Sequence, residues 1–491
     1  MLLLGIDLGT SFIKVSVIDS ISQSCIASVQ YPEKEVSIVS IQSGWAEQSP
    51  DQWWFDIKQA IINLNKTRKY NPNDIKAIGI SYQMHGLVLI DKKGNVLRDS
   101  IIWCDSRAVS YGAKAEEKIG KEKCYTHLLN SPGNFTASKL AWVKENEPSI
   151  YDDIYKVLLP GDFISYRMTN ELSTTPSALS EGVFWDFKKN NISIDILNYF
   201  DFDKSIFPEI KDVFSNHGQL SNDVAHELNL TPQIPITYKA GDQPNNAFSL
   251  NVIEHGEFAA TAGTSGVIYG IMNTLNGEIN AKINRFAHVN HDKDSVRIGT
   301  LLCVNGAGIM NKYIKQKFGS DLSYHTFDDL AASVTPGSNG LHILPFGNGA
   351  ERIFDNRTIG AHIENLDLNK HESPHFFRAV QEGVAFSFKY GFEHMCSSNF
   401  FPIKIKAAKS NMFKSPVFKE AFVNLIGVSL EIYDTDGSIG AAKGSGVIIG
   451  AYSSPLDACT IQKPIEKIFP TKETLYNELY NDWLISLKKH I

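Results

Sequence analysis

The stretch Ile6-Asp7-Leu8-Gly9-Thr10-Ser11, followed by the apolar run 12–17, decides the fold expected for this chain. A second stretch of the same kind, Thr261-Ala262-Gly263-Thr264-Ser265-Gly266, precedes Val267-Ile268-Tyr269 about half the chain further on. Each stretch predicts a β-strand, a tight Gly-Thr-Ser turn and a returning strand. Turns of this kind expose backbone N–H groups and hydroxyls that suit phosphate oxygens. The pair therefore predicts a duplicated phosphate-binding fold with a cleft between its halves.

The composition restricts the kinds of partner that this chain is expected to bind. Of its 491 residues, 43% are hydrophobic and 21% are charged, as in ordinary globular proteins. A formal net charge of -7 and a pI near 6.1 argue against a nucleic-acid-binding protein. No 18-residue apolar stretch predicts a membrane span, and the opening Leu2-Leu3-Leu4 run is too short for a signal peptide. We expect small-molecule partners, without nucleic acid or membrane.

The cysteines give no sign of a metal or disulfide framework. All six stand far apart, and no Cys-x-x-Cys pair occurs among them. Their spacing therefore indicates neither a zinc site nor a set of disulfides. Reduced thiols are typical of the cytoplasm, which is the predicted location.

Strands and helices alternate along the sequence, which predicts the α/β class. Serine caps a helix and proline fits its first turn, so Ser-Pro pairs predict helix starts at 49–50, 373–374 and 415–416. Apolar segments predict strands at 75–81, 87–91, 403–407 and 429–433. The chain is too long for one core, and prolines and glycines cluster at 232–244. We therefore predict two domains, residues 1–244 and residues 245–491.

Asp7 ends the first predicted strand, just before the glycine turn. A carboxylate in this place suits Mg²⁺, held through water beside bound phosphates. Gly9, Thr10 and Ser11 would supply donors to the phosphates, and Lys14 would supply a cation. The alternative is an aspartate that only caps the turn.

The second hairpin lacks this carboxylate, because Ala262 stands where a strict repeat would have an aspartate. Gly263, Thr264 and Ser265 are therefore predicted to hold phosphate without metal, or to form an ordinary hairpin turn. Gly306 lies at the start of a predicted helix, where small residues allow a nucleotide to approach the N–H groups. Close helix packing would explain this glycine equally well.

Asp242, in Gly241-Asp242-Gln243-Pro244, lies at the predicted domain boundary. A carboxylate in a cleft there would accept a proton from a substrate hydroxyl as its oxygen attacks phosphorus. The alternative is a turn-forming aspartate in a linker.

Two segments that follow predicted strands carry residues that suit a sugar or polyol. Gln83 and His85 offer hydrogen bonds, and Met84 offers adaptable apolar contact. Trp103 and Asp105 add an aromatic surface and a carboxylate. Alternatively, Trp103 belongs to the core and Asp105 forms a surface pair with Arg107.

Taken in order, these motifs resemble the FGGY family of carbohydrate kinases, and within it the xylulokinases. The resemblance spans essentially the whole chain, through residues 5–11, 83–86, 102–107, 132–136, 156–160, 241–243 and 263–266. It implies an α/β fold of two actin-like ATPase domains of the ribonuclease H-like type, flanking a catalytic cleft. It also implies ATP and Mg²⁺ as cofactors, a sugar as substrate, and a possible homodimer.

Carried over residue by residue, the resemblance gives roles to the site residues. Asp242 matches the general base, with Gln243 beside the substrate, and Asp7 matches the essential aspartate near Mg²⁺ and phosphate. Met84 and His85 match the sugar-contacting pair of xylulokinases. The implied reaction converts ATP and D-xylulose to ADP and D-xylulose 5-phosphate.

Two departures from the family pattern, and a distinction that depends on the single residue Gly86, keep other readings open. Ala407-Ala408-Lys409-Ser410-Asn411 replaces a glycine-rich segment near the nucleotide, where Lys409 and Asn411 are candidate contacts. Similar gluconokinases have serine where Gly86 stands, and the Gly-Asp-Gln at 241–243 resembles glycerol kinases. The alternatives are a kinase for gluconate, another ketose or glycerol, an actin-like ATPase without a sugar substrate, and a sugar sensor that has lost catalysis.

Overall fold

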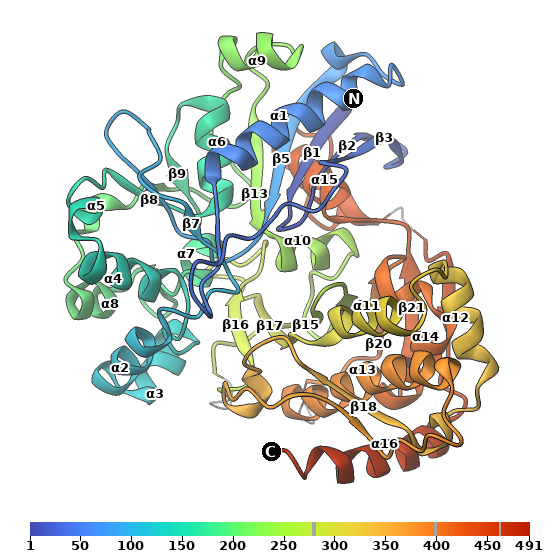
Figure 1. The fold of residues 1–491 in the computed structure, drawn as a ribbon. Helices are drawn as coiled ribbons and strands as arrows, with labels where there is room; N and C mark the ends of the chain where they lie inside the picture. The colour runs from blue at the N-terminus through green and yellow to red at the C-terminus, as the bar shows by residue number, and fades with distance from the viewer. Residues whose placement is uncertain (277–280, 397–399, 461–462) are drawn as a thin grey trace.

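Two β-sheets, each built around one Gly-Thr-Ser hairpin, organise the fold (Figure 1). The computed structural model describes residues 1–276, 281–396, 400–460 and 463–491. In spatial order, the first sheet contains β13 (Ile236–Gly241), β5 (Ile75–Tyr82), β1 (Leu2–Leu8), β2 (Ile13–Asp19) and β3 (Cys25–Tyr31). The second contains β16 (Asn284–Ala287), β17 (Ile298–Val304), β15 (Gly266–Met272), β14 (Phe258–Ala262), β20 (Lys404–Ala408), β21 (Ser429–Tyr433) and β22 (Glu466–Ile468).

The register of the first sheet gathers the ends of three strands at one edge. β1 and β2 form the predicted antiparallel hairpin, in which Asp7 pairs with Lys14. β5 runs parallel to β1 and places Ser81 beside Asp7, and β13 runs parallel to β5 and ends at Gly241. Because parallel strands end at the same edge, the Asp7 turn, the segment after β5 and Asp242 come together there.

The predicted helix starts are confirmed. α1 (Pro50–Lys66) is capped by the Ser49 hydroxyl, which accepts a hydrogen bond from the backbone N–H of Gln52. α13 (Ser373–Met395) begins at the second Ser-Pro pair, and α14 (Pro416–Ile426) is capped by Ser415. α14 ends at Gly427, whose φ of 79° is the left-handed conformation that favours glycine.

The remaining helices cover the sheets or build lobes beside them. To the left in Figure 1, an extra lobe beside the first sheet holds α2 (Val109–Ile119), α3 (Lys121–Lys123), α4 (Thr136–Asn146), α5 (Pro148–Asp152) and α8 (Ile194–Phe200). Around the first sheet also lie α6 (Pro160–Thr169), α7 (Pro176–Glu181), α9 (Asn222–Leu228) and α10 (Asp242–Ser249). The second half adds α11 (Ala307–Phe318), α12 (Tyr324–Ser333) and α16 (Glu473–Leu487).

Short strands pair outside the two sheets. They are β4 (Glu47–Gln48) with β7 (Ser100–Ile101), β6 (Val88–Ile90) with β8 (Lys156–Leu158), β9 (Ser173–Thr174) with β12 (Glu209–Ile210), β10 (Trp185–Asp186) with β11 (Asn191–Ile192), and β18 (His342–Phe346) with β19 (Gly360–Glu364). Each of the six cysteines is a free thiol. Within the described ranges, we find no helix with both the length and the apolar character needed to cross a membrane.

One helix from the second half of the chain packs on the first sheet. α15 (Gly437–Ile448), orange in Figure 1, lies against the blue strands β1 and β5. Added methyl groups on Gly5 and Gly79 would overlap backbone carbonyl oxygens of α15, so the close approach requires glycine in both strands. The predicted boundary at 244/245 also falls inside α10. This boundary stays a prediction. The structure shows that α15, from the second half of the chain, packs on the sheet of the first half.

Candidate active site

Asp7 lies at the centre of a group of charged and polar residues at the end of β1. Its Oδ1 accepts a hydrogen bond from the Ser81 hydroxyl at 2.8 Å. Gly437, the first residue of α15, lies so close that a methyl group there would overlap the Asp7 carboxylate. Lys14, which we predicted as a phosphate contact, forms an ion pair with Asp436 at 3.1 Å. A phosphate would therefore share this cation with Asp436.

Asp242 is the first residue of α10, and its carboxylate interacts with that of Asp7. Burial is the main cause that raises the pKa of Asp242 to about 7, and the negative charge of Asp7 adds to it. Burial likewise raises the pKa of Asp7 to about 6, although the Ser81 hydrogen bond opposes the rise. Gln243, the next residue of α10, is half-buried and donates to Asp242, which lowers that pKa in part. A carboxyl that titrates near neutral pH suits a general base.

The first Gly-Thr-Ser turn is tied to both predicted sugar segments. The turn closes through the Gly9 N–H, which donates to the Phe12 carbonyl, while the Ser11 carbonyl accepts from the Val36 N–H. The Thr10 hydroxyl donates to Gln83 Oε1 at 3.0 Å and accepts from Trp103 Nε1 at 2.9 Å.

Both polar atoms of the Gln83 side chain contact the protein. Besides its bond from Thr10, its Nε2 donates to Gln48 Oε1 at 3.0 Å, and the residue is buried. Gln83 and Trp103 thus connect the two sugar segments to the first Gly-Thr-Ser turn through their hydrogen bonds with Thr10. Their predicted contact with substrate stays untested.

The Met84-His85 segment lies near the N-terminal end of α10. Met84 is buried, and a methyl group on Gly241 would approach its Cγ to 2.7 Å. His85 adopts a φ of 64°, and its Nδ1–H donates to the Glu181 carbonyl at 2.9 Å. Burial lowers the pKa of His85 to about 3, so the ring is neutral and its Nε2 keeps a free lone pair. A neutral histidine of fixed tautomer is suited to accept a hydrogen bond from a sugar hydroxyl.

The ring of His85 lies among aromatic rings from both halves of the chain. Phe135 at the start of α4 meets it at a centroid distance of 4.9 Å, and Phe286 of β16 meets it at 5.2 Å. Phe286 belongs to the second sheet, so both halves shape the surroundings of the predicted sugar contact.

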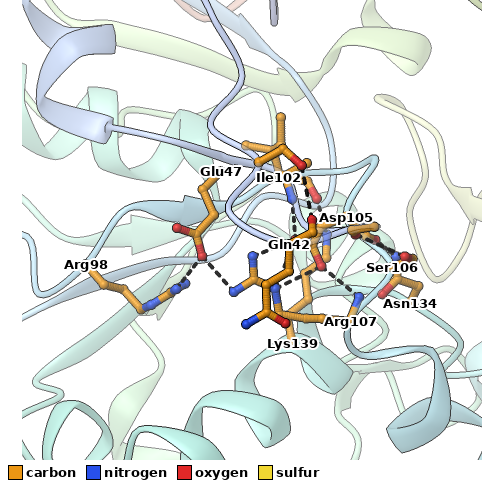
Figure 2. A network of polar contacts seen from close by, with 12 residues as sticks. Gln42, Glu47, Arg98, Ile102, Asp105, Ser106, Arg107, Asn134 and Lys139 are labelled. Carbon is orange, nitrogen blue, oxygen red and sulfur yellow. Dashed lines mark hydrogen bonds and ion pairs between the residues drawn. The ribbon is translucent and has the colours of Figure 1, made fainter.

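Figure 2 shows a network of polar contacts that includes Asp105, Arg107 and Lys139. Asp105 is completely buried, where it accepts from the Ala46 N–H at 2.6 Å and pairs with Arg107 at 2.7 Å. The side-chain amide of Asn134 also donates to the backbone carbonyl of Asp105. The carboxylate is therefore engaged with the protein on both oxygens. The pair with Arg107 is buried, so the predicted alternative of a surface pair is wrong, and the predicted contact of Asp105 with substrate stays untested. The sequence shows that Asp105 and Arg107 stand two residues apart, but this spacing does not indicate whether the pair is buried.

Lys139 of α4 belongs to the same network and joins the two sugar segments. Its ammonium donates to the carbonyl oxygens of His85 at 2.8 Å and of Ile102 at 2.9 Å (Figure 2). Burial lowers the pKa of this lysine to about 8, although Asp105 opposes the shift. Sequence reasoning missed Lys139, because a lysine on a helix usually faces solvent.

The second hairpin meets the segment that replaces the family's glycine-rich loop. A methyl group on Gly263 would lie 3.3 Å from the Asn411 amide, so these two predicted residues are neighbours. The Thr264 carbonyl accepts from the first turn of α11, and Ser265 hydrogen-bonds the thiol of Cys303. Lys409 is exposed, which agrees with both predicted alternatives, a contact with a ligand phosphate and a side chain in solvent.

Gly306 occupies a tightly packed turn. Its N–H, with that of Asn305, donates to the Glu351 carboxylate, each at 3.0 Å. A methyl group on Gly306 would overlap the Pro345 carbonyl. The Gly306 N–H, which would have to bind a phosphate, already donates to Glu351. This agrees with the alternative that Gly306 serves close packing. Glu351 gave no sequence signal, because it lies 45 residues further along the chain.

With this geometry in view, comparison with known proteins identifies the family. The model of the N-terminal domain of the FGGY family of carbohydrate kinases matches residues 2–249, about half of the chain. The chain belongs to the FGGY family of carbohydrate kinases. It is similar to the xylulose kinase of Bacillus subtilis, at 28% identity over 390 residues, which cover 78% of this chain and 75% of that protein.

Solved structures place this kinase in the same fold. The xylulose kinase of Lactobacillus acidophilus superposes with a TM-score of 0.88 at 21% identity, covering 99% of this chain and 98% of that one. The gluconate kinase of the same organism gives 0.86 at 22% identity, with the same coverage. The predicted α/β fold of two actin-like ATPase domains is confirmed, and the protein is a sugar kinase that uses ATP as its family does.

Proposed function

We propose that this kinase phosphorylates D-xylulose, giving D-xylulose 5-phosphate and ADP, with Asp242 as the general base. The observation that carries the proposal is that Asp242 interacts with the charge of Asp7, while Gly241, the residue before it, lies against Met84. Relatives named xylulose kinase, at 25–29% identity over most of the chain, support this choice of sugar.

In the proposed reaction, the terminal hydroxyl of the sugar attacks the γ-phosphorus of ATP. The new O–P bond forms, the bond between γ-phosphorus and ADP breaks, and the hydroxyl proton passes to the Asp242 carboxylate. His85 Nε2 would accept a hydrogen bond from another hydroxyl and so orient the sugar. The two Gly-Thr-Ser hairpins would hold the phosphates.

The donor set around Asp7 fits Mg²⁺. Its hard carboxylate oxygens are the ligands that this ion prefers, and burial disfavours the uncompensated charge of Asp7 that a bound ion would stabilise. A magnesium ion bound near Asp7 would neutralise charge on the phosphates. The cytoplasmic location and the possible homodimer stay predictions.

Arg352 favours a second candidate, an anionic sugar such as gluconate. Its guanidinium lies over the Phe135 ring at 5.5 Å, and its positive charge helps to lower the pKa of His85. Within the described part of the chain, no carboxylate forms an ion pair with it, and a backbone carbonyl is its hydrogen-bond partner. A cation in this place would bind the carboxylate of an aldonic acid.

A panel of acceptors tests the proposal. ADP release would be measured with D-xylulose, D-ribulose, D-gluconate, glycerol and no sugar, at saturating MgATP. We expect the highest kcat/KM with D-xylulose. A higher value with gluconate, reduced at least tenfold by Arg352→Gln, would support the second candidate instead. Sugar-independent turnover at the full rate would contradict both.

A further inference from the structure

We propose that His362, Glu364 and His490 form a binding site for a divalent transition-metal ion of the zinc type, separate from the active site. One ligand atom of each residue lies within 4.8 Å of the other two. Two imidazoles and one carboxylate are a ligand set that zinc accepts, with water in the fourth position. Cysteine spacing, the usual sequence sign of zinc, gave no hint of this site.

The strand β19 presents two of the ligands on one face. Side chains alternate along a strand, so His362 and Glu364 point the same way. Both are partly buried, whereas Ala361 before them and Ile363 between them are exposed. This spacing brings the ligand atoms of i and i+2 together without any change in the backbone.

The third ligand arrives through the packing of α16 on the β18–β19 hairpin. Trp483 of α16 donates to the Ile343 carbonyl at 3.0 Å, and His342 hydrogen-bonds Ser486 at 2.9 Å. These buried contacts fix the end of the helix. His490, which follows that helix, reaches Glu364 Oε1 with its Nε2 at 3.0 Å.

Two of the ligands, His362 and Glu364, are oriented by a second contact, as is usual for metal ligands in proteins. His362 Nε2–H donates to the Ile359 carbonyl at 2.7 Å, which leaves the Nδ1 lone pair free. Lys489 holds the other carboxylate oxygen of Glu364, Oε2, at 2.9 Å. The oxygen Oε1 therefore stays directed toward the histidines.

The site receives the ion when one histidine ring changes its orientation. Zinc–nitrogen bonds of about 2.0–2.1 Å place tetrahedral ligand atoms roughly 3.3 Å apart. Glu364 and His490 already lie near this separation. The rings of His362 and His490 stack at a centroid distance of 3.7 Å, so one ring must turn to direct its in-plane lone pair at the ion. Side chains of Glu364 and His490 are 18% and 23% exposed, so an ion can enter from solvent. Binding would replace the proton between Glu364 and His490.

Zinc titration of the full chain, without a histidine tag, Mg²⁺ or nucleotide, tests the proposal. We expect one equivalent of Zn²⁺ to bind in competition with a fluorescent chelator, and the melting temperature to rise by a few °C because the ion binds the folded state. His362→Asn, Glu364→Gln and His490→Asn should each weaken binding at least tenfold. Kinase activity without zinc should be unchanged.

His325→Asn is the matched control, because His325 is exposed on the surface of α12 and pairs there with the Asp329 carboxylate at 2.7 Å. Its zinc affinity should equal that of the parent protein. Wild-type protein loaded with Co²⁺ offers a measurement that needs no variant, since tetrahedral cobalt absorbs strongly in the visible range. Absence of stoichiometric binding, or binding that survives His490→Asn unchanged, would overturn the proposal and leave a plain ion pair.

Discussion

Asp242→Asn should make the unliganded protein more stable at pH 8 while it removes activity. The pKa of Asp242 is raised from 3.8 to about 7, mainly by burial and then by Asp7. A raised pKa means that the ionised form is disfavoured in the folded state, so stability present below the unfolded pKa is lost as pH rises through about 7. Asparagine has the same shape and no charge, so the variant avoids this loss.

The magnitude follows from the size of the shift. About three pKa units correspond to an upper limit of ~4 kcal/mol at pH well above 7. Asp242 is only half-buried, so solvent screening reduces this to about 1–2 kcal/mol. Urea unfolding of the unliganded protein would show this gain at pH 8 and little difference near pH 4. The exposed Asp321→Asn is the control and should show no pH-dependent gain.

The same variant should lose turnover. Removal of a general base lowers kcat by roughly 10²–10⁴, measured as ADP release at saturating ATP and sugar, with sugar binding largely kept. Near-normal turnover would refute the role of Asp242 as base. A stability difference that is equal at pH 8 and pH 4 would refute the electrostatic reasoning, even if turnover fell.

Three further predictions concern the rest of the site. The kcat/KM of the wild-type protein should fall below about pH 7, because protonated Asp242 cannot accept the hydroxyl proton; a profile flat from pH 5 to 8 would contradict this. Lys139→Met should raise KM for the sugar about tenfold and lower stability by about 2–4 kcal/mol, because two buried carbonyls lose their donor. The exposed Lys114→Met, on α2, is its control in both sugar kinetics and urea unfolding. Gly437→Ala should lower kcat/KM for MgATP at least tenfold by displacing the Asp7 carboxylate, and unchanged MgATP kinetics would exclude this close contact.

Local physical chemistry made much of the fold predictable. A glycine turn between two apolar runs defines a hairpin, and a Ser-Pro pair defines a helix start, because only neighbouring residues are involved. The predicted hairpins around Gly9 and Gly263, the helix starts and the α/β class are all present. Asp7 and Asp242 were also recognisable, since Asp7 is the last residue but one of β1 and Asp242 follows directly on β13.

What the sequence alone determined, then, is which segments end in chemically useful residues, because that information lies within a few positions of each turn. Only the tertiary structure decided which of those residues are free. It buried Asp105 against Arg107, engaged Gln83 with Thr10, and gave the Gly306 N–H to Glu351. These outcomes depend on contacts between residues far apart in sequence, as do the packing of α15 on β1 and the approach of His490 to Glu364. No local pattern encodes such contacts, since they form only when whole sheets and helices pack against each other.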